Sequence, residues 1–141
     1  MSEGYVEEMA TRLHASSVRL LRMLRRQDDE SGLSGPRLSA LSVIVRAGPV
    51  SLAELAAAEQ VRPPTMSRIV DGLVEAGLIT REAKPGDRRS VRIEATQEGR
   101  RLLASGRERR VRALTERLNK IAESERRALA RGIEILERVV R

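Results

Sequence analysis

The chain contains no cysteine, phenylalanine or tryptophan, and Tyr5 is its single aromatic residue. The lack of cysteine excludes disulfides, thiolate metal ligands and thiol-based redox sensing. No apolar run approaches the roughly 20 residues that a membrane-spanning helix needs, so we expect no membrane partner. Without Phe or Trp, the core has to be built from Leu, Val, Ile, Met and Ala.

Lysine is also scarce, although the chain of 141 residues carries a formal net charge of +7. Of its 27 basic residues, only Lys84 and Lys120 are lysines. Arginine binds phosphate through a planar fork, so the excess fits a polyanionic partner; the alternative is a solvated basic face. The length predicts one domain, residues 1–141. No signal-peptide pattern opens the sequence, and we therefore expect a cytoplasmic protein.

Both ends of the chain have apolar residues at helical spacing, in seams too narrow for burial in a conventional core. The first helix is expected from about Tyr5 to Gln27, and its seam includes Leu13 and Leu20. Beyond Thr96 the pattern is helical to the end, with a break near residues 122–124. The seam of the last helix consists of Leu129, Ile133, Leu136 and Val140. We expect residues 5–27 and 97–141 to form the dimerisation part, with a second copy covering these seams.

The middle of the chain, residues 34–96, begins with three predicted helices. The first follows Ser34 and has Pro36 in its first turn. The second, from about Leu52 to Glu59, starts at a capping box in which Ser51 can accept the amide of Glu54. The third begins at Pro63-Pro64 and runs to about Ala76, where Gly77 provides the C-terminal stop.

Two short strand patterns follow, Leu78–Ala83 and Ser90–Ala95, joined by the turn residues KPGD. Helices followed by a basic hairpin describe a winged helix-turn-helix, a mainly α fold in which the third helix enters the DNA major groove. The alternative is an ordinary amphipathic helix. The groove-facing residues would lie at its N-terminal end: Arg62, Pro63, Pro64, Thr65, Ser67 and Arg68.

One stretch, Asp87-Arg88-Arg89 followed by a strand and then by Ala95-Thr96 and Gly99, resembles the wing of the MarR family of transcriptional regulators. It matches the family's D-x-R motif and the subsequent L-T-x-x-G, with Ala95 in place of Leu. The match runs from Ser51 to Gly99, and the flanking helices agree in number and position. Two residues depart from the family pattern: Arg62 replaces a small N-cap residue, and Gly72 stands where a larger residue is common.

The resemblance implies that the hairpin is a wing, with Arg89 reaching into a minor groove and Asp87 bracing it. Arginine is the side chain usually drawn to the negative potential of a narrow minor groove. Arg88 and Lys84 would lie near phosphates. The alternative is a surface turn with a weak ion pair.

The resemblance also implies a homodimeric repressor on a palindromic double-stranded operator, released by a small-molecule effector. The effector would lie between the dimerisation and DNA-binding parts. Candidate lining residues are Leu13, Arg22, Leu38 and Val45.

Enzymatic chemistry finds little support in the sequence. His14 is the only histidine, and no glycine-rich phosphate loop occurs. We expect no catalysis, metal or cofactor. The Arg-rich run from Arg100 to Arg112 is expected to be a solvated face; the alternative is a DNA contact. A winged-helix protein-interaction module without operator binding is the alternative to a DNA-binding regulator.

Overall fold

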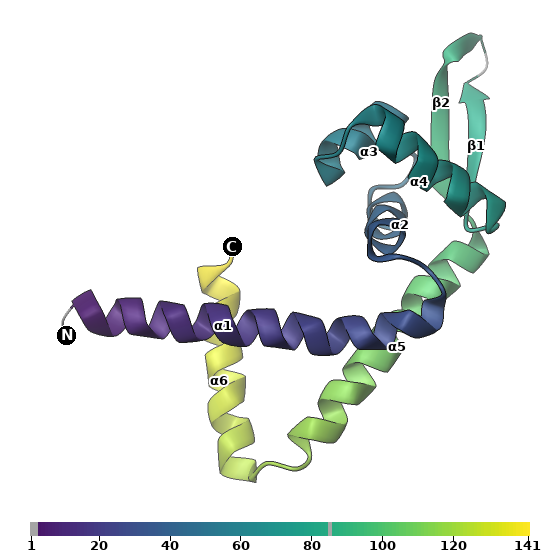
Figure 1. Cartoon of the computed structure of the whole chain (residues 1–141). Helices are drawn as coiled ribbons and strands as arrows, with labels where there is room; N and C mark the ends of the chain where they lie inside the picture. Colours follow the sequence, from purple (N-terminus) through teal and green to yellow (C-terminus); the bar gives the residue numbers. More distant parts are fainter. Residues whose placement is uncertain (1–2, 85) are drawn as a thin grey trace.

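The computed structural model describes residues 3–84 and 86–141, with the backbone alone for residues 84 and 87–90. Figure 1 shows one end of the molecule formed by α2, α3, α4 and the hairpin, while the long α1, α5 and α6 extend from it. The predicted winged-helix fold, mainly helical with one two-stranded hairpin, is confirmed. The elements are α1 (Glu3–Asp28), the short 3-10 helix η1 (Asp29–Ser31), α2 (Gly35–Ala47), α3 (Leu52–Glu59), α4 (Pro63–Glu75), β1 (Ile79–Lys84), β2 (Asp87–Ala95), α5 (Gln97–Leu118) and α6 (Glu123–Val139).

The helix ends follow the local sequence. The Ser51 hydroxyl accepts a 3.1 Å hydrogen bond from the amide of Glu54 and so begins α3. α4 starts at Pro63, directly after the N-cap residue Arg62, as the proline pair predicts. Gly77 has a φ of +74° and reverses the chain into β1, a conformation that favours glycine.

The hydrophobic core is aliphatic, as predicted, and joins α2, α3, α4 and the hairpin. Val50 extends the sheet by exchanging two backbone hydrogen bonds with Ile93, of 3.0 and 2.8 Å. The core residues are Ala40, Leu41, Ile44, Val50, Leu55, Ala56, Met66, Val70, Leu73, Leu78, Ile79, Ile93 and Ala95. This core fixes α4 and the hairpin relative to each other.

The hairpin differs from the prediction at its second strand. β2 begins at Asp87, not at Ser90, so Arg88 and Arg89 lie in the strand and not in the turn. Pairing is regular as far as Ala83–Val91, and the next pair is Lys84–Asp87. The ladder is therefore irregular near the tip, and such bulges redirect a strand locally.

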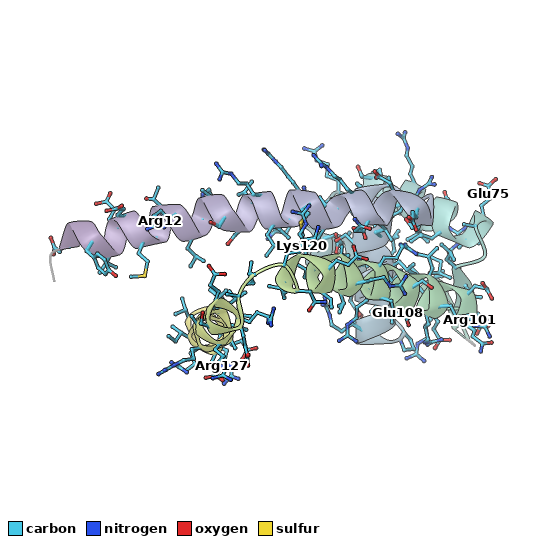
Figure 2. All side chains as sticks on the ribbon, turned by 90° about the horizontal axis from the view of Figure 1, so that it is seen from below. Arg12, Glu75, Arg101, Glu108, Lys120 and Arg127 are labelled. Atoms are coloured by element: carbon cyan, nitrogen blue, oxygen red, sulfur yellow. The ribbon has the colours of Figure 1, made fainter. Side chains whose placement is uncertain are left out.

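The connection between α5 and α6 lies between Leu118 and Glu123, slightly before the predicted break. From the first turn of α6, Arg126 donates to the carbonyl oxygens of Leu118 (3.2 Å) and Ile121 (2.7 Å). α6 turns back and crosses the line of α1 in Figure 1, but in Figure 2, where it is seen end-on, it lies apart from α1. No helix in the described ranges combines the length and apolar character needed to cross a membrane.

Candidate nucleic-acid interface

The first two turns of α4 present most of the predicted groove-facing residues to solvent. Arg62, Pro64, Thr65 and Arg68 are exposed, and Ser67 is half-buried. Met66, Val70 and Leu73 are fully buried, because their spacing of four and three residues places them on the opposite face. α4 is thus anchored by aliphatic side chains and displays a polar face with two guanidinium groups at its N-terminal end.

α4 and the hairpin are also joined by a charged pair. Arg81 of β1 donates to Asp71 of α4 through an Nη1–Oδ1 hydrogen bond of 2.6 Å. Both side chains are more than a third exposed, so the pair contributes little to stability. Sequence reasoning missed it, because the two residues belong to different elements.

The predicted wing residues fall at the end of β1 and the beginning of β2. Lys84 ends β1, and Asp87, Arg88 and Arg89 begin β2. Their side chains lie outside the described part of the structure. The bracing of Arg89 by Asp87 therefore stays a prediction.

The Thr96–Gly99 part of the wing motif closes the root of the hairpin. The Thr96 hydroxyl accepts from the amide of Gly99 (3.1 Å) and donates to the carbonyl of Gly77 (2.7 Å). A Cβ atom at Gly99 would lie well under 3 Å from the carbonyl oxygen of Leu78. This motif therefore lets α5 pass close to the turn between α4 and β1, which holds the hairpin in place.

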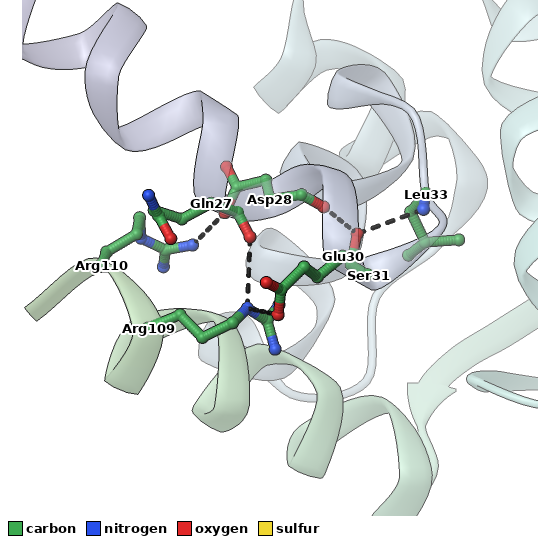
Figure 3. Close-up of polar contacts among 7 residues, drawn as sticks. All are labelled: Gln27, Asp28, Glu30, Ser31, Leu33, Arg109 and Arg110. Atoms are coloured by element: carbon green, nitrogen blue, oxygen red, sulfur yellow. Dashed lines mark hydrogen bonds and ion pairs between the residues drawn. The ribbon is translucent and has the colours of Figure 1, made fainter. Parts of the chain in front are cut away.

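A second group of contacts joins α5 to the end of α1 (Figure 3). Arg110 pairs with Asp28 at 2.5 Å, while Arg109 donates to the Gln27 carbonyl (3.2 Å) and lies 3.4 Å from a carboxylate oxygen of Glu30. We call these residues the α1–α5 clasp. The expectation of a solvated Arg face holds for Arg107 and Arg112, which are exposed, but is wrong for Arg109 and Arg110. The sequence signal that could have predicted this clasp is the acidic run at residues 28–30 together with the Arg-rich run of the later helix.

An open cleft of about 740 Å³ lies beside the clasp, between the end of α1, the start of α2 and α5. Of the four candidate effector-lining residues, Leu38 lines this cleft, whereas Leu13, Arg22 and Val45 do not belong to its described lining. Its walls are Arg25, Asp28, Asp29, Leu33, Gly35, Pro36, Leu38, Ser39, Ser42, Leu103 and Arg110. Within the described ranges, no three metal-ligating side chains come together.

The predicted dimerisation residues form exposed apolar surface on α1, on α6 and at Val140, which follows α6 directly. Leu13 is 42% exposed, Ile133 45% and Val140 73%. Leu20 and Leu129 are similarly exposed, and Leu136 is half-buried. Single exposed apolar side chains are ordinary, but a row of them along two helices indicates an interaction surface.

Together, the helix order, the polar face of α4 and the adjoining hairpin define a winged helix-turn-helix protein. The model of the MarR family matches residues 33–91. An HTH-type transcriptional regulator of Mycobacterium leprae is 33% identical over 128 residues, which cover 91% of this chain and 90% of the relative. The chain belongs to the MarR family of transcriptional regulators, which is not an enzyme class.

Solved structures agree with this assignment. A Pseudomonas aeruginosa protein described as a transcriptional regulator is 30% identical, with a TM-score of 0.83, and the match covers 100% of this chain and 99% of that one. A mutant of S. aureus MepR, solved bound to an oligodeoxyribonucleotide, shares the fold at 16% identity, with a TM-score of 0.73 and coverage of 100% and 99%.

Proposed function

We propose that this protein is a homodimeric, sequence-specific DNA-binding repressor that a small molecule releases from its operator. The observation that carries the proposal is the division of α4 into a buried aliphatic face and an exposed face bearing Arg62, Thr65 and Arg68. A recognition helix requires this division, because its first turns contact base edges while the opposite side packs on the domain. The DNA-bound state of the MepR mutant supports it by analogy of fold.

Within this proposal, α4 reads the major groove and the hairpin reads the adjacent minor groove. Arg68 and Ser67 can donate to base edges, whose pattern in the major groove distinguishes all four base pairs. Arg89 would enter the minor groove, which mainly separates A·T from G·C. Residues 34–96 therefore form the DNA-binding part.

The dimer is proposed from the exposed apolar rows on α1 and α6. A lone subunit leaves Leu13, Ile133 and Val140 in water, and their burial stabilises association in proportion to the apolar area removed from water. A two-fold dimer also presents two copies of α4 to the two halves of a palindrome.

The effector is proposed to occupy the cleft beside the α1–α5 clasp. Leu33, Leu38 and Leu103 supply an apolar lining, and Arg25 can meet an anionic group. Because α1 and α5 belong to the dimerisation part and α2 to the DNA-binding part, a ligand here can change how the two parts are oriented. The lining is mixed, with leucines beside Arg25, Asp29 and the paired Asp28 and Arg110, and it suits a small amphipathic molecule whose anionic group can reach Arg25.

The test compares Arg68→Ala with Arg127→Ala on a duplex selected by the wild-type protein from a random library. Arg127 extends from α6 on the side away from α1 and α5, so its loss controls for net charge (Figure 2). We expect Arg68→Ala to cost about 1–3 kcal/mol in binding and to relax sequence preference, and Arg127→Ala to cost much less. Equal small effects would favour the protein-interaction module instead.

A further inference from the structure

The guanidinium group of Arg37 rests on the recognition helix at Gly72. Arg37 lies in the first turn of α2 and is half-buried. A Cβ atom placed on Gly72 would be 2.5 Å from Nη2 of Arg37, 2.6 Å from its Cζ and 2.8 Å from its Nε. The charged end of Arg37 therefore occupies the space in which a side chain at position 72 would begin. The guanidinium of Arg37 fits there because Gly72 has no side chain.

Arg37 carries a charge that has no ion-pair partner among the described side chains. Throughout residues 3–84 and 86–141, no ion pair or side-chain hydrogen bond involving Arg37 is described. The neighbouring carboxylate on α4, that of Asp71, is paired with Arg81 of β1. Partial removal of a positive charge from water, without a carboxylate to pair with it, destabilises the folded protein. A residue of this kind is therefore expected to serve a purpose other than stability.

Arg37 lies next to the exposed face of α4, as the helical positions of its neighbours show. Gly72 follows Arg68 by four residues, so the two lie on one side of α4, one turn apart. Thr65, about two turns before Gly72, shares that side and is exposed. Arg37 therefore stands beside the face of α4 that is proposed to enter the major groove. A helix in that groove runs between two phosphate backbones, which side chains on its flanks can reach.

We infer that Arg37 is a further DNA-binding residue, which contacts a backbone phosphate beside the recognition helix, and that Gly72 makes room for it. This inference rests on the proposed function. It also accounts for the departure at Gly72, because a larger residue at this position would exclude the guanidinium of Arg37. As a phosphate contact, Arg37 adds affinity without sequence preference.

The experiment measures affinity for the selected duplex over a range of salt concentrations, for the wild-type protein, Arg37→Gln and Arg46→Gln. Arg46 is the matched control, because it is exposed in the last turn of the same helix, nine residues on and so on its opposite side. Arg37→Gln should weaken binding about 5- to 10-fold and lower the log–log salt slope by about one unit per bound subunit, on the same preferred sequence. Arg46→Gln should leave the slope near that of the wild type.

Gly72→Ala separates this role from a structural one. Alanine favours a helix more than glycine does, so it should keep or raise the melting temperature. Its Cβ would nevertheless displace the guanidinium from its place beside α4, so binding should weaken, though by less than in Arg37→Gln because the displaced side chain keeps its charge. The double variant Arg37→Gln/Gly72→Arg, which restores the charge from α4, should recover most of the salt slope.

Two results would overturn the inference while the proposed function stands: a wild-type salt slope in Arg37→Gln, or wild-type affinity in Gly72→Ala. Loss of melting temperature in Arg37→Gln with an unchanged slope would show that Arg37 only packs on α4. If the wild-type protein selects no duplex at all, the proposed function itself fails.

Discussion

Replacing Gly99 by alanine should open the root of the hairpin. Gly99 lies in the first turn of α5, and an added Cβ would meet the backbone carbonyl oxygen of Leu78 well inside contact distance and Leu41 Cδ1 at 3.2 Å. A carbonyl in the turn between α4 and β1 cannot rotate away as a side-chain end can. The substitution must therefore push α5 off this turn.

The cost follows from the bonds that hold this junction. Three converge there: Thr96 Oγ1 to Gly77 O (2.7 Å), Thr96 N to Leu78 O (3.0 Å) and Gly99 N to Thr96 Oγ1 (3.1 Å). Losing two of them costs about 1–3 kcal/mol, and the overpacking adds about 1–3 kcal/mol. The better helix propensity of alanine offsets at most about 1 kcal/mol. The net loss should be about 1–5 kcal/mol, which lowers the melting temperature by roughly 3–15 °C for a chain of this length.

Calorimetric melting of the wild-type protein, Gly99→Ala and Gly4→Ala tests this reasoning. Gly4 also lies in a helix, but nothing stands within 4 Å of its absent Cβ, so Gly4→Ala should leave or slightly raise the melting temperature. A melting temperature of Gly99→Ala at or above that of the wild type would refute the close approach of α5 to Leu78.

Three further predictions concern the clasp, the wing and the dimer. Asp28→Asn should destabilise the protein by about 1–2 kcal/mol in denaturant unfolding, because Arg110 stays half-buried without its carboxylate; a double-mutant cycle with Arg110→Gln that shows no coupling would contradict the clasp. Asp87→Ala should weaken duplex binding if the carboxylate braces Arg89, whereas tighter binding in an anisotropy titration would show that it only repels phosphate. Ile133→Glu on α6 should shift sedimentation from dimer to monomer, because it places a charge among apolar side chains; a persistent dimer would place the interface elsewhere.

The elements were predictable where local chemistry determines them. Pro63-Pro64 and Gly77 bound α4, and the spacing of Met66, Val70 and Leu73 identifies its buried face. The start of β2 was not predictable in the same way. The strand patterns end where the alternation of apolar and polar residues ends, but the backbone pairing continues to Lys84–Asp87.

Most of the contacts between elements could not be predicted. Asp71–Arg81 and Asp28–Arg110 join residues that are distant in sequence, and charge alone does not select one arginine among so many. The reach of Arg37 across Gly72 depends on the packing of α2 against α4, which no local pattern specifies. The resemblance indicated that the Thr96–Gly99 motif matters, and only the geometry shows what it does.

The central claim is that a dimer of this chain reads a palindromic operator through α4 and the wing. The most direct measurement is a titration of the selected duplex, which gives the stoichiometry and the dependence of affinity on salt. The account predicts two chains per duplex and a steep linear fall of log affinity with log salt concentration, since several arginines displace condensed counterions. Failure to select any duplex at low salt, or one chain per duplex with a flat salt dependence, would contradict it.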